Sequence, residues 1–245
     1  VMIITAPELA PKLGKARLKI YEDLLKTPLA QLIQQANVSA SLNTLTGDTT
    51  MEVVDIRFED IQGVQTLVYE VEIEGEFTSG NSGATLQGQT GRLDIEYDGI
   101  DILRASDLSM WDSEFTLDVK FALFNIGLLT TTLADITFAT VYEPPREKYD
   151  FPLRTGDQWV SSYESGTNVT GSSDYFDPTS FDTPYIEDNT TYQVTTDGEP
   201  TEDGSGIDYT GCSDSYKVNN WNNTGSPGGF EWYCPAVRSY AWYRI

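Results

Sequence analysis

The chain contains no histidine, which removes the commonest general base near neutral pH. Serine–histidine and cysteine–histidine nucleophilic catalysis and the usual zinc hydrolase sites are therefore not expected. No Gly-rich phosphate loop precedes an expected helix, so nucleotide binding is not expected either. Glycoside cleavage by a pair of carboxylates is the one reaction class that stays open. We expect a protein that is not an enzyme.

Positive charge is scarce, since 15 Lys and Arg residues stand against 38 Asp and Glu residues, for a net charge of −23. The imbalance starts late: residues 1–47 hold five basic and three acidic residues, whereas residues 48–145 hold four and nineteen. A surface this acidic repels phosphate backbones and anionic lipid heads, so nucleic acid is not an expected partner. Solubility at high ionic strength is the interpretation we favour, and loosely held divalent cations are the alternative.

Long hydrophobic runs are also missing. No stretch of 18 apolar residues occurs, so no transmembrane segment is expected. The start shows no signal peptide and is expected to be a processed end. Its apolar, β-prone segment is Val1, Met2, Ile3, Ile4 and Thr5.

Only two cysteines occur, Cys212 and Cys234, and a pair at this spacing predicts one disulfide in an oxidising compartment. Four Asn-X-Ser/Thr sequences are candidate glycosylation sites in an exported chain. These sites are Asn37, Asn168, Asn189 and Asn222. Together with the scarcity of lysine, these signals predict a secreted or cell-surface glycoprotein.

The N-terminal part has helical periodicity. Apolar residues recur at three-to-four spacing from Leu13 to Leu25, which predicts a helix. Pro28 is expected to begin a second helix, with Thr27 as its N-cap. We expect the helices of residues 12–36 to cover one side of a sheet.

From about residue 50 the period changes to two. Between Leu67 and Phe77, apolar residues alternate with four glutamates, as in a strand with one buried and one wet face. Similar rows run through 93–97, 115–123 and 136–142. Gly-containing segments at 79–83 and 98–99 are expected to be turns.

These patterns predict a mainly β protein with long, curved antiparallel sheets, half-barrel or sandwich-like, plus one or two short N-terminal helices. Pro144-Pro145 is expected to end a strand and separate two domains, residues 1–143 and 144–245. The polar segment 164–190 is expected to form long loops.

Three short motifs in residues 149–245 carry a family resemblance. They are Phe151-Pro152-Leu153-x-x-Gly156-x-x-Trp159, Cys212-x-x-x-Tyr216-Lys217-Val218 and Trp232-Tyr233-Cys234-Pro235-x-Val237-Arg238. In this order they resemble β-rich envelope proteins related to the LolA/LppX lipoprotein-carrier superfamily. The resemblance implies curved antiparallel sheets wrapped around helix or apolar side chains, acyl chains held against the concave sheet, and no catalytic residues.

One loop is rich in carboxylates and glycines. Its acidic residues are Asp197, Glu199, Glu202, Asp203 and Asp208. Hard cations such as Ca²⁺ take several oxygen ligands on a flexible loop, although this spacing does not match an EF-hand. We favour a solvated turn, with a Ca²⁺ site as the alternative, and expect no other cofactor.

Two functional hypotheses follow. The preferred one is a structural or assembly protein of the cell surface, a sheath, layer or filament subunit, that associates with itself or with other surface proteins. Residues 1–5 either pair within their own sheet or complete a neighbouring subunit's sheet by strand addition. The alternative is a non-enzymatic binding module that holds an apolar ligand, a lipid or a glycan on its concave sheet.

Overall fold

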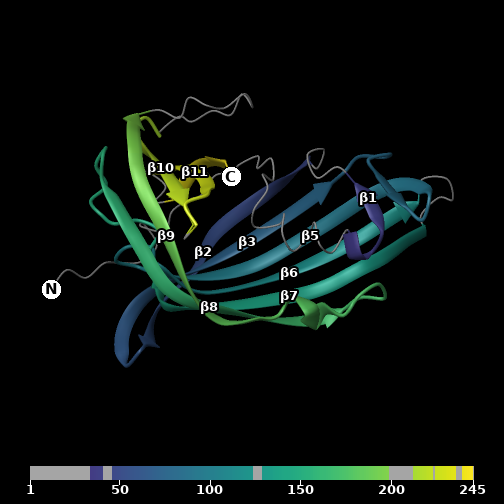
Figure 1. Ribbon diagram of the computed structural model, residues 1–245, viewed down its shortest axis with the longest axis horizontal. Coiled ribbons are helices and arrows are strands. Elements are labelled where there is room, and N and C mark those ends of the chain that lie inside the picture. Colours follow the sequence, from purple (N-terminus) through teal and green to yellow (C-terminus); the bar gives the residue numbers. More distant parts are fainter. Residues whose placement is uncertain are drawn as a thin grey trace.

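The computed structural model describes residues 34–40, 46–123, 129–198, 212–222, 224–235 and 239–244. Its strands form one antiparallel sheet that curls into a half-barrel (Figure 1), which confirms the predicted fold class. The strands are β1 (Val38–Ala40), β2 (Thr46–Ile61), β3 (Val64–Thr78), β4 (Ala84–Leu86), β5 (Gln89–Arg104), β6 (Met110–Leu123), β7 (Leu129–Arg146), β8 (Gln158–Ser172), β9 (Thr183–Gly198), β10 (Ser215–Trp221), β11 (Pro227–Cys234) and β12 (Ser239–Arg244). A short 3-10 helix, η4 (Pro178–Phe181), joins β8 to β9.

Most neighbouring strands in the sheet are also neighbours in sequence. The path runs from β2 through β3 and β5 and then in chain order to β12. Strand β5 pairs with β4 near its start and with β3 along its remaining length, while β1 pairs with β4. The hairpin turns Gln62-Gly63 and Gln87-Gly88 have positive φ at both residues, as tight two-residue turns between twisted strands require.

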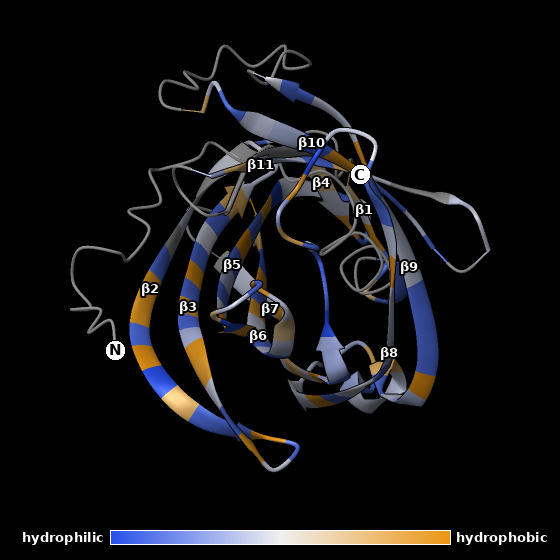
Figure 2. Ribbon diagram, turned by 90° about the vertical axis from the view of Figure 1, so that its left-hand side faces the viewer, coloured by the Kyte–Doolittle hydropathy of each residue, from blue (hydrophilic) through white to orange (hydrophobic). Residues whose placement is uncertain are grey.

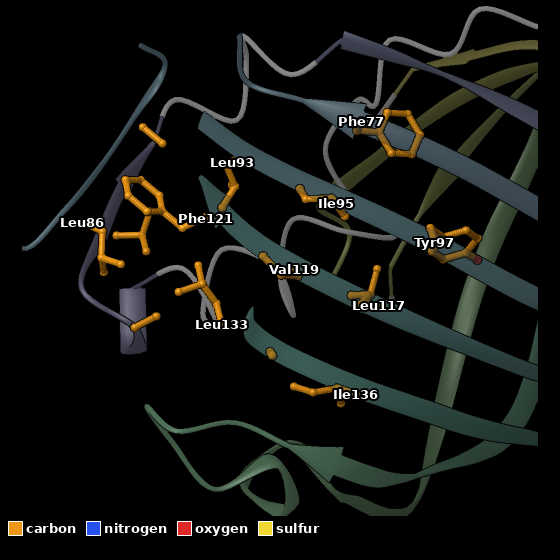
Figure 3. Packing of buried hydrophobic residues seen from close by; sticks show 14 of the residues in the cluster. Phe77, Leu86, Leu93, Ile95, Tyr97, Leu117, Val119, Phe121, Leu133 and Ile136 are labelled. Atoms are coloured by element: carbon orange, nitrogen blue, oxygen red, sulfur yellow. The ribbon is translucent and has the colours of Figure 1, made fainter. Parts of the chain in front are cut away.

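The concave face, defined by Leu93, Leu117 and Ile136, carries the main apolar cluster (Figure 3). These three side chains are fully buried because each points to the same side of the sheet at every second position. Val38 of β1 and Leu86 of β4 pack into the same cluster. Burying one face of long twisted strands in this way curls the sheet around its own side chains.

A second apolar cluster, which includes Trp159, Tyr192 and Val218, continues along the same face. Phe138 of β7 pairs with Val169 of β8, and both belong to the main cluster. Trp159 lies an even number of residues before Val169 in β8, so it points to the concave side as well. It stacks on Tyr192 of β9 with ring centroids 5.4 Å apart. The opposite, outer face is largely exposed to solvent, as the alternating colours of β3 show (Figure 2). Ile61, Val68 and Ile102 nevertheless form a third, smaller buried cluster on that outer face.

Three predictions about strand ends are wrong. Strand β7 continues through Pro144-Pro145, where its pairing with β6 is irregular between Met110 and Asp112. Most of segment 164–190 forms the end of β8 and the start of β9, because its many β-branched threonines suit a pleated sheet, and only residues 173–182 form a connection. Gly99 is not in a turn: it lies within β5, where an added Cβ would come 3.1 Å from the Cβ of Phe115.

The sheet runs without a break from β7 into β8 across the expected domain boundary. The division into domains 1–143 and 144–245 stays a prediction. Residues 12–33 of the expected helices lie outside the described residues. The described end of this segment includes Ala36, which belongs to the main cluster.

We expect Ile136→Ala to destabilise the protein by about 3 kcal/mol, because a fully buried isoleucine loses its contacts and leaves a cavity. The matched control is Ile186→Ala in β9, where the side chain is 54% exposed and the expected change is within about 0.5 kcal/mol. Urea unfolding followed by circular dichroism measures both. Equal losses in the two variants would contradict the assignment of the core face.

Candidate functional site

Strand β2 forms one edge of the sheet. Among the described strands it pairs only with β3, and its 16 residues leave a row of backbone N–H and C=O groups on the other side. Such a row is a template for another strand, and native proteins usually shorten, charge or cover it. A 16-residue edge is long for a strand in this position. The β2 edge is therefore the first candidate site.

Apolar side chains are exposed on this edge strand. Phe58 is 68% exposed and Val54 is 47% exposed, while Ile56 between them is half-buried. Phe58 pairs with Leu67, whose place in the alternation of β3 puts Phe58 on the concave side of the β2 edge. Scattered surface apolar residues are ordinary, but here they lie beside unpaired backbone groups.

The charges around the β2 edge are almost all negative. Glu52, Asp55 and Asp60 are exposed along the strand. The cation Arg57 is already engaged, since its guanidinium hydrogen-bonds Glu70 across the hairpin and lies 3.4 Å from Asp55. A register shift between Val53 and Asp55 adds a β-bulge, a device that limits uncontrolled pairing at edges. The edge therefore favours a partner with positive charge.

A polar centre lies on the concave face around Arg146, at the end of β7. The Nε of Arg146 donates a hydrogen bond to the Tyr192 hydroxyl at 3.2 Å, and its guanidinium lies 5.5 Å from the ring centroid of Tyr163. Tyr142 packs edge-to-face against Tyr163 with centroids 5.5 Å apart. Burial raises the pKa of both Tyr142 and Tyr163, so these phenols stay neutral. Within the described residues no carboxylate pairs with Arg146, and aromatic faces and a hydroxyl hold the cation instead.

Asp101 of β5 points to the same face. Its Oδ1 accepts a hydrogen bond from the Ser113 hydroxyl of β6 at 2.7 Å. Desolvation raises the pKa of Asp101 above its ordinary value, although the Ser113 hydrogen bond opposes the rise. Sequence reasoning missed this centre because the segment around Arg146 was interpreted as a domain boundary, and a lone Asp or Arg in a β pattern gives no motif.

The predicted disulfide is present in the structure. Cys212 and Cys234 are bonded, with their Cα atoms 5.4 Å apart, and no free cysteine is present. The bond links the segment before β10 to the end of β11 and is buried at both residues. It constrains the C-terminal strands next to the second apolar cluster.

The four candidate glycosylation residues are all exposed. Asn37 lies in the turn before β1, Asn168 in β8 and Asn189 in β9. Asn222 follows β10, and its Oδ1 accepts hydrogen bonds from Thr224 and Ser226. Exposure is required for glycosylation, which itself stays a prediction.

The expected acidic loop falls mostly outside the described residues, which include only Asp197 of its five carboxylates; Glu199, Glu202, Asp203 and Asp208 are not described. In the described part of the chain, no group of three or more His, Cys, Asp or Glu side chains is arranged to hold a metal ion. The Ca²⁺ site stays a prediction. The segment Val1 to Thr5 also lies outside the described residues.

None of the helical segments that the structure describes has the length and apolar character of a transmembrane span. In comparisons with known proteins, no family model, no curated protein and no solved structure matches this chain. The resemblance to lipoprotein carriers therefore stays a prediction.

We expect the double substitution Cys212→Ala, Cys234→Ala to lower stability by about 3 kcal/mol, because the 22-residue loop regains freedom in the unfolded chain. Guanidinium unfolding measures the loss. Thiol titration of the unfolded native protein should find no reactive sulfhydryl, and two free thiols per chain would contradict the bond.

We expect Asp101→Asn to stabilise the protein near neutral pH. A carboxyl whose folded pKa is raised disfavours the folded state once it ionises, and an amide keeps an acceptor for Ser113 without that charge. The gain should fall towards zero as pH drops below the ordinary pKa of Asp, about 3.9. Denaturant melts at several pH values measure it. Asp98→Asn, on the exposed outer face of β5, is the control and should change stability by less than about 0.5 kcal/mol.

Proposed function

We propose that this chain is a non-enzymatic structural protein of the cell surface or extracellular space that assembles by β-strand addition at the β2 edge. The observation that carries the proposal is the long β2 strand, paired on one side only among the described strands. The disulfide and the exposed Asn-X-Ser/Thr sites support an oxidising compartment.

Strand addition draws its affinity from main-chain hydrogen bonds, and pockets for alternate side chains give specificity. The β2 edge offers both elements. Its backbone row is 16 residues long, and Val54 and Phe58 provide exposed apolar contacts for an incoming strand. A short segment such as Val1 to Thr5 needs only part of this length.

Charge favours one arrangement of two copies over another. Two β2 edges placed side by side would bring their exposed acidic residues, Glu52, Asp55 and Asp60, against one another. Residues 1–47 carry five basic and three acidic residues, whereas the rest of the sequence has a large excess of acidic residues. We therefore infer that the incoming strand is Val1 to Thr5 of a second copy, followed by its lysine-rich stretch. Such head-to-tail contacts generate rings or open filaments.

We expect deletion of residues 1–6 and the substitution Phe58→Lys each to weaken assembly at least tenfold. The first removes the incoming strand, and the second replaces an exposed edge contact with a charge that repels the basic segment. Sedimentation velocity over a wide range of protein concentration, with electron microscopy of the assembled material, measures the effect.

The matched control is Ile100→Lys in β5, an apolar position that is 40% exposed and paired on both sides, with Glu72 of β3 and Glu114 of β6. This variant should assemble like the native chain. If the native chain is monomeric at all concentrations and deletion of residues 1–6 only lowers its stability, the segment pairs within its own sheet and the proposal fails.

In the alternative function a ligand would bind to the concave face of the sheet, where side chains of the chain itself already pack. Ala36, Val38 and Leu86 belong to the same buried cluster as residues of β5, β6 and β7, so the chain itself covers part of that face.

A further inference from the structure

A pocket of about 460 Å³ lies on strands that do not pair with β2. This volume is within the range of small-molecule sites, roughly 300–1,000 Å³. Three neighbouring strands and one turn build it. Its lining residues are Gln158 of β8, Asn189, Thr191 and Gln193 of β9, Trp221 of β10, and Asn222 and Gly225 of the following turn.

The pocket belongs to the outer face of the sheet. Gln158 pairs with Gln193, and Thr191 pairs with Trp221, so these side chains point to the same side. The residues between them, such as Trp159 and Tyr192, are buried on the concave side. Strand alternation thus places every second residue of β9 from 189 to 193 in one outward row.

The lining holds no charged residue, although the chain as a whole has a net charge of −23. Its polar groups are amides and one hydroxyl, which can both donate and accept hydrogen bonds. No described residue forms a hydrogen bond with the side chains of Gln158, Asn189 or Gln193, so their amides are available to a ligand. With no cation to attract an anion and no carboxylate to attract a cation, this lining suits a neutral ligand rich in hydroxyl groups.

One wall of the pocket is fixed before any ligand arrives. The Oδ1 of Asn222 accepts hydrogen bonds from the Thr224 N–H at 3.1 Å, the Thr224 hydroxyl at 2.7 Å and the Ser226 N–H at 3.0 Å. The Gly225 N–H donates to the Asn222 carbonyl at 2.9 Å and closes the turn. Because the Asn222 oxygen is engaged in the turn, its NH₂ group is the part left to donate. A preorganised wall lowers the entropic cost of binding.

Trp221 supplies the apolar surface that a sugar ring needs. Its side chain is half-buried, at the last residue of β10 and at the rim of the amide row. An indole ring offers a flat apolar face with large contact area, while sugar rings present C–H groups on one face and hydroxyls around the edge. We propose that this outer-face pocket binds neutral carbohydrate, with Trp221 stacking on a sugar ring and the amides of Gln158, Asn189 and Gln193 hydrogen-bonding its hydroxyls.

The test uses the full chain from a bacterial host that adds no N-glycans, so that no glycan on Asn189 or Asn222 fills the pocket. The probes are cellohexaose, chitohexaose and maltohexaose, with hexagalacturonate as the charged comparator, followed by titration calorimetry and tryptophan fluorescence. At least one neutral hexasaccharide should bind. Hexagalacturonate should bind at least tenfold more weakly, because the lining offers no cation.

Trp221→Ala should weaken binding at least tenfold, and Trp221→Phe should restore most of it, because a ring face is kept. Gln158→Ala, at an exposed residue that the fold does not need, should weaken binding about threefold to tenfold. The control is Tyr185→Ala, an exposed aromatic residue on β9 outside the lining, which should leave binding unchanged.

Two results overturn the proposal. One is the absence of binding by all three neutral probes at concentrations up to about 10 mM, which is weaker than ordinary recognition. The other is binding that survives unchanged in both Trp221→Ala and Gln158→Ala, which would place the sugar elsewhere. Neither result touches the assembly proposed at the β2 edge, because Phe58 and the pocket residues lie on different strands.

Discussion

Main-chain hydrogen bonding along long antiparallel strands is the constraint from which the rest of this structure follows. Every strand from β3 to β11 in the main path has a hydrogen-bonded neighbour on each side, and the side chains then have only two directions to take. The concave direction gathers Leu93, Leu117 and Ile136 into one apolar cluster, and the twist of the strands curls the sheet around them. Because β2 ends the described sheet and pairs with β3 alone, a long row of its backbone groups has no partner among the described strands.

The outer face accounts for much of the acidity. Opposite-charge contacts there are partly exposed, as between Lys120 and Asp118 at 2.6 Å, and pairs near the surface contribute little stability. Stability must come chiefly from the three apolar clusters and from the disulfide. The repulsion among outward carboxylates instead separates chains from one another and from other polyanions. A contact between copies must therefore occur where backbone hydrogen bonds and a basic segment offset that repulsion.

The period-two pattern was enough to predict the fold class, because the alternation from Leu67 to Phe77 has one physical explanation in a half-buried strand. The disulfide was predictable because only two cysteines occur. The ends of the strands were not predictable. Pro144-Pro145 ends a strand only where the local pairing needs a backbone N–H, and Gly99 ends one only where the packing needs a Cβ. The pocket on β8 to β10 was not predictable either. Its glutamines, asparagines and threonine form a group only once the register of three strands is known, and polar residues in an outward row have no motif of their own.

An uncharged, amide-lined hollow on so acidic a sheet is itself informative. An outward position with no role is filled at low cost by Asp, Glu or Lys, as on β3, where glutamates occupy one outward place after another. The outward row of β9 from Asn189 to Gln193 departs from that composition beside Trp221. Neutral amides there cost solubility relative to carboxylates and add no packing to the core. The departure is understandable if the row serves a ligand that charge would repel, on strands other than the one proposed to join neighbouring chains.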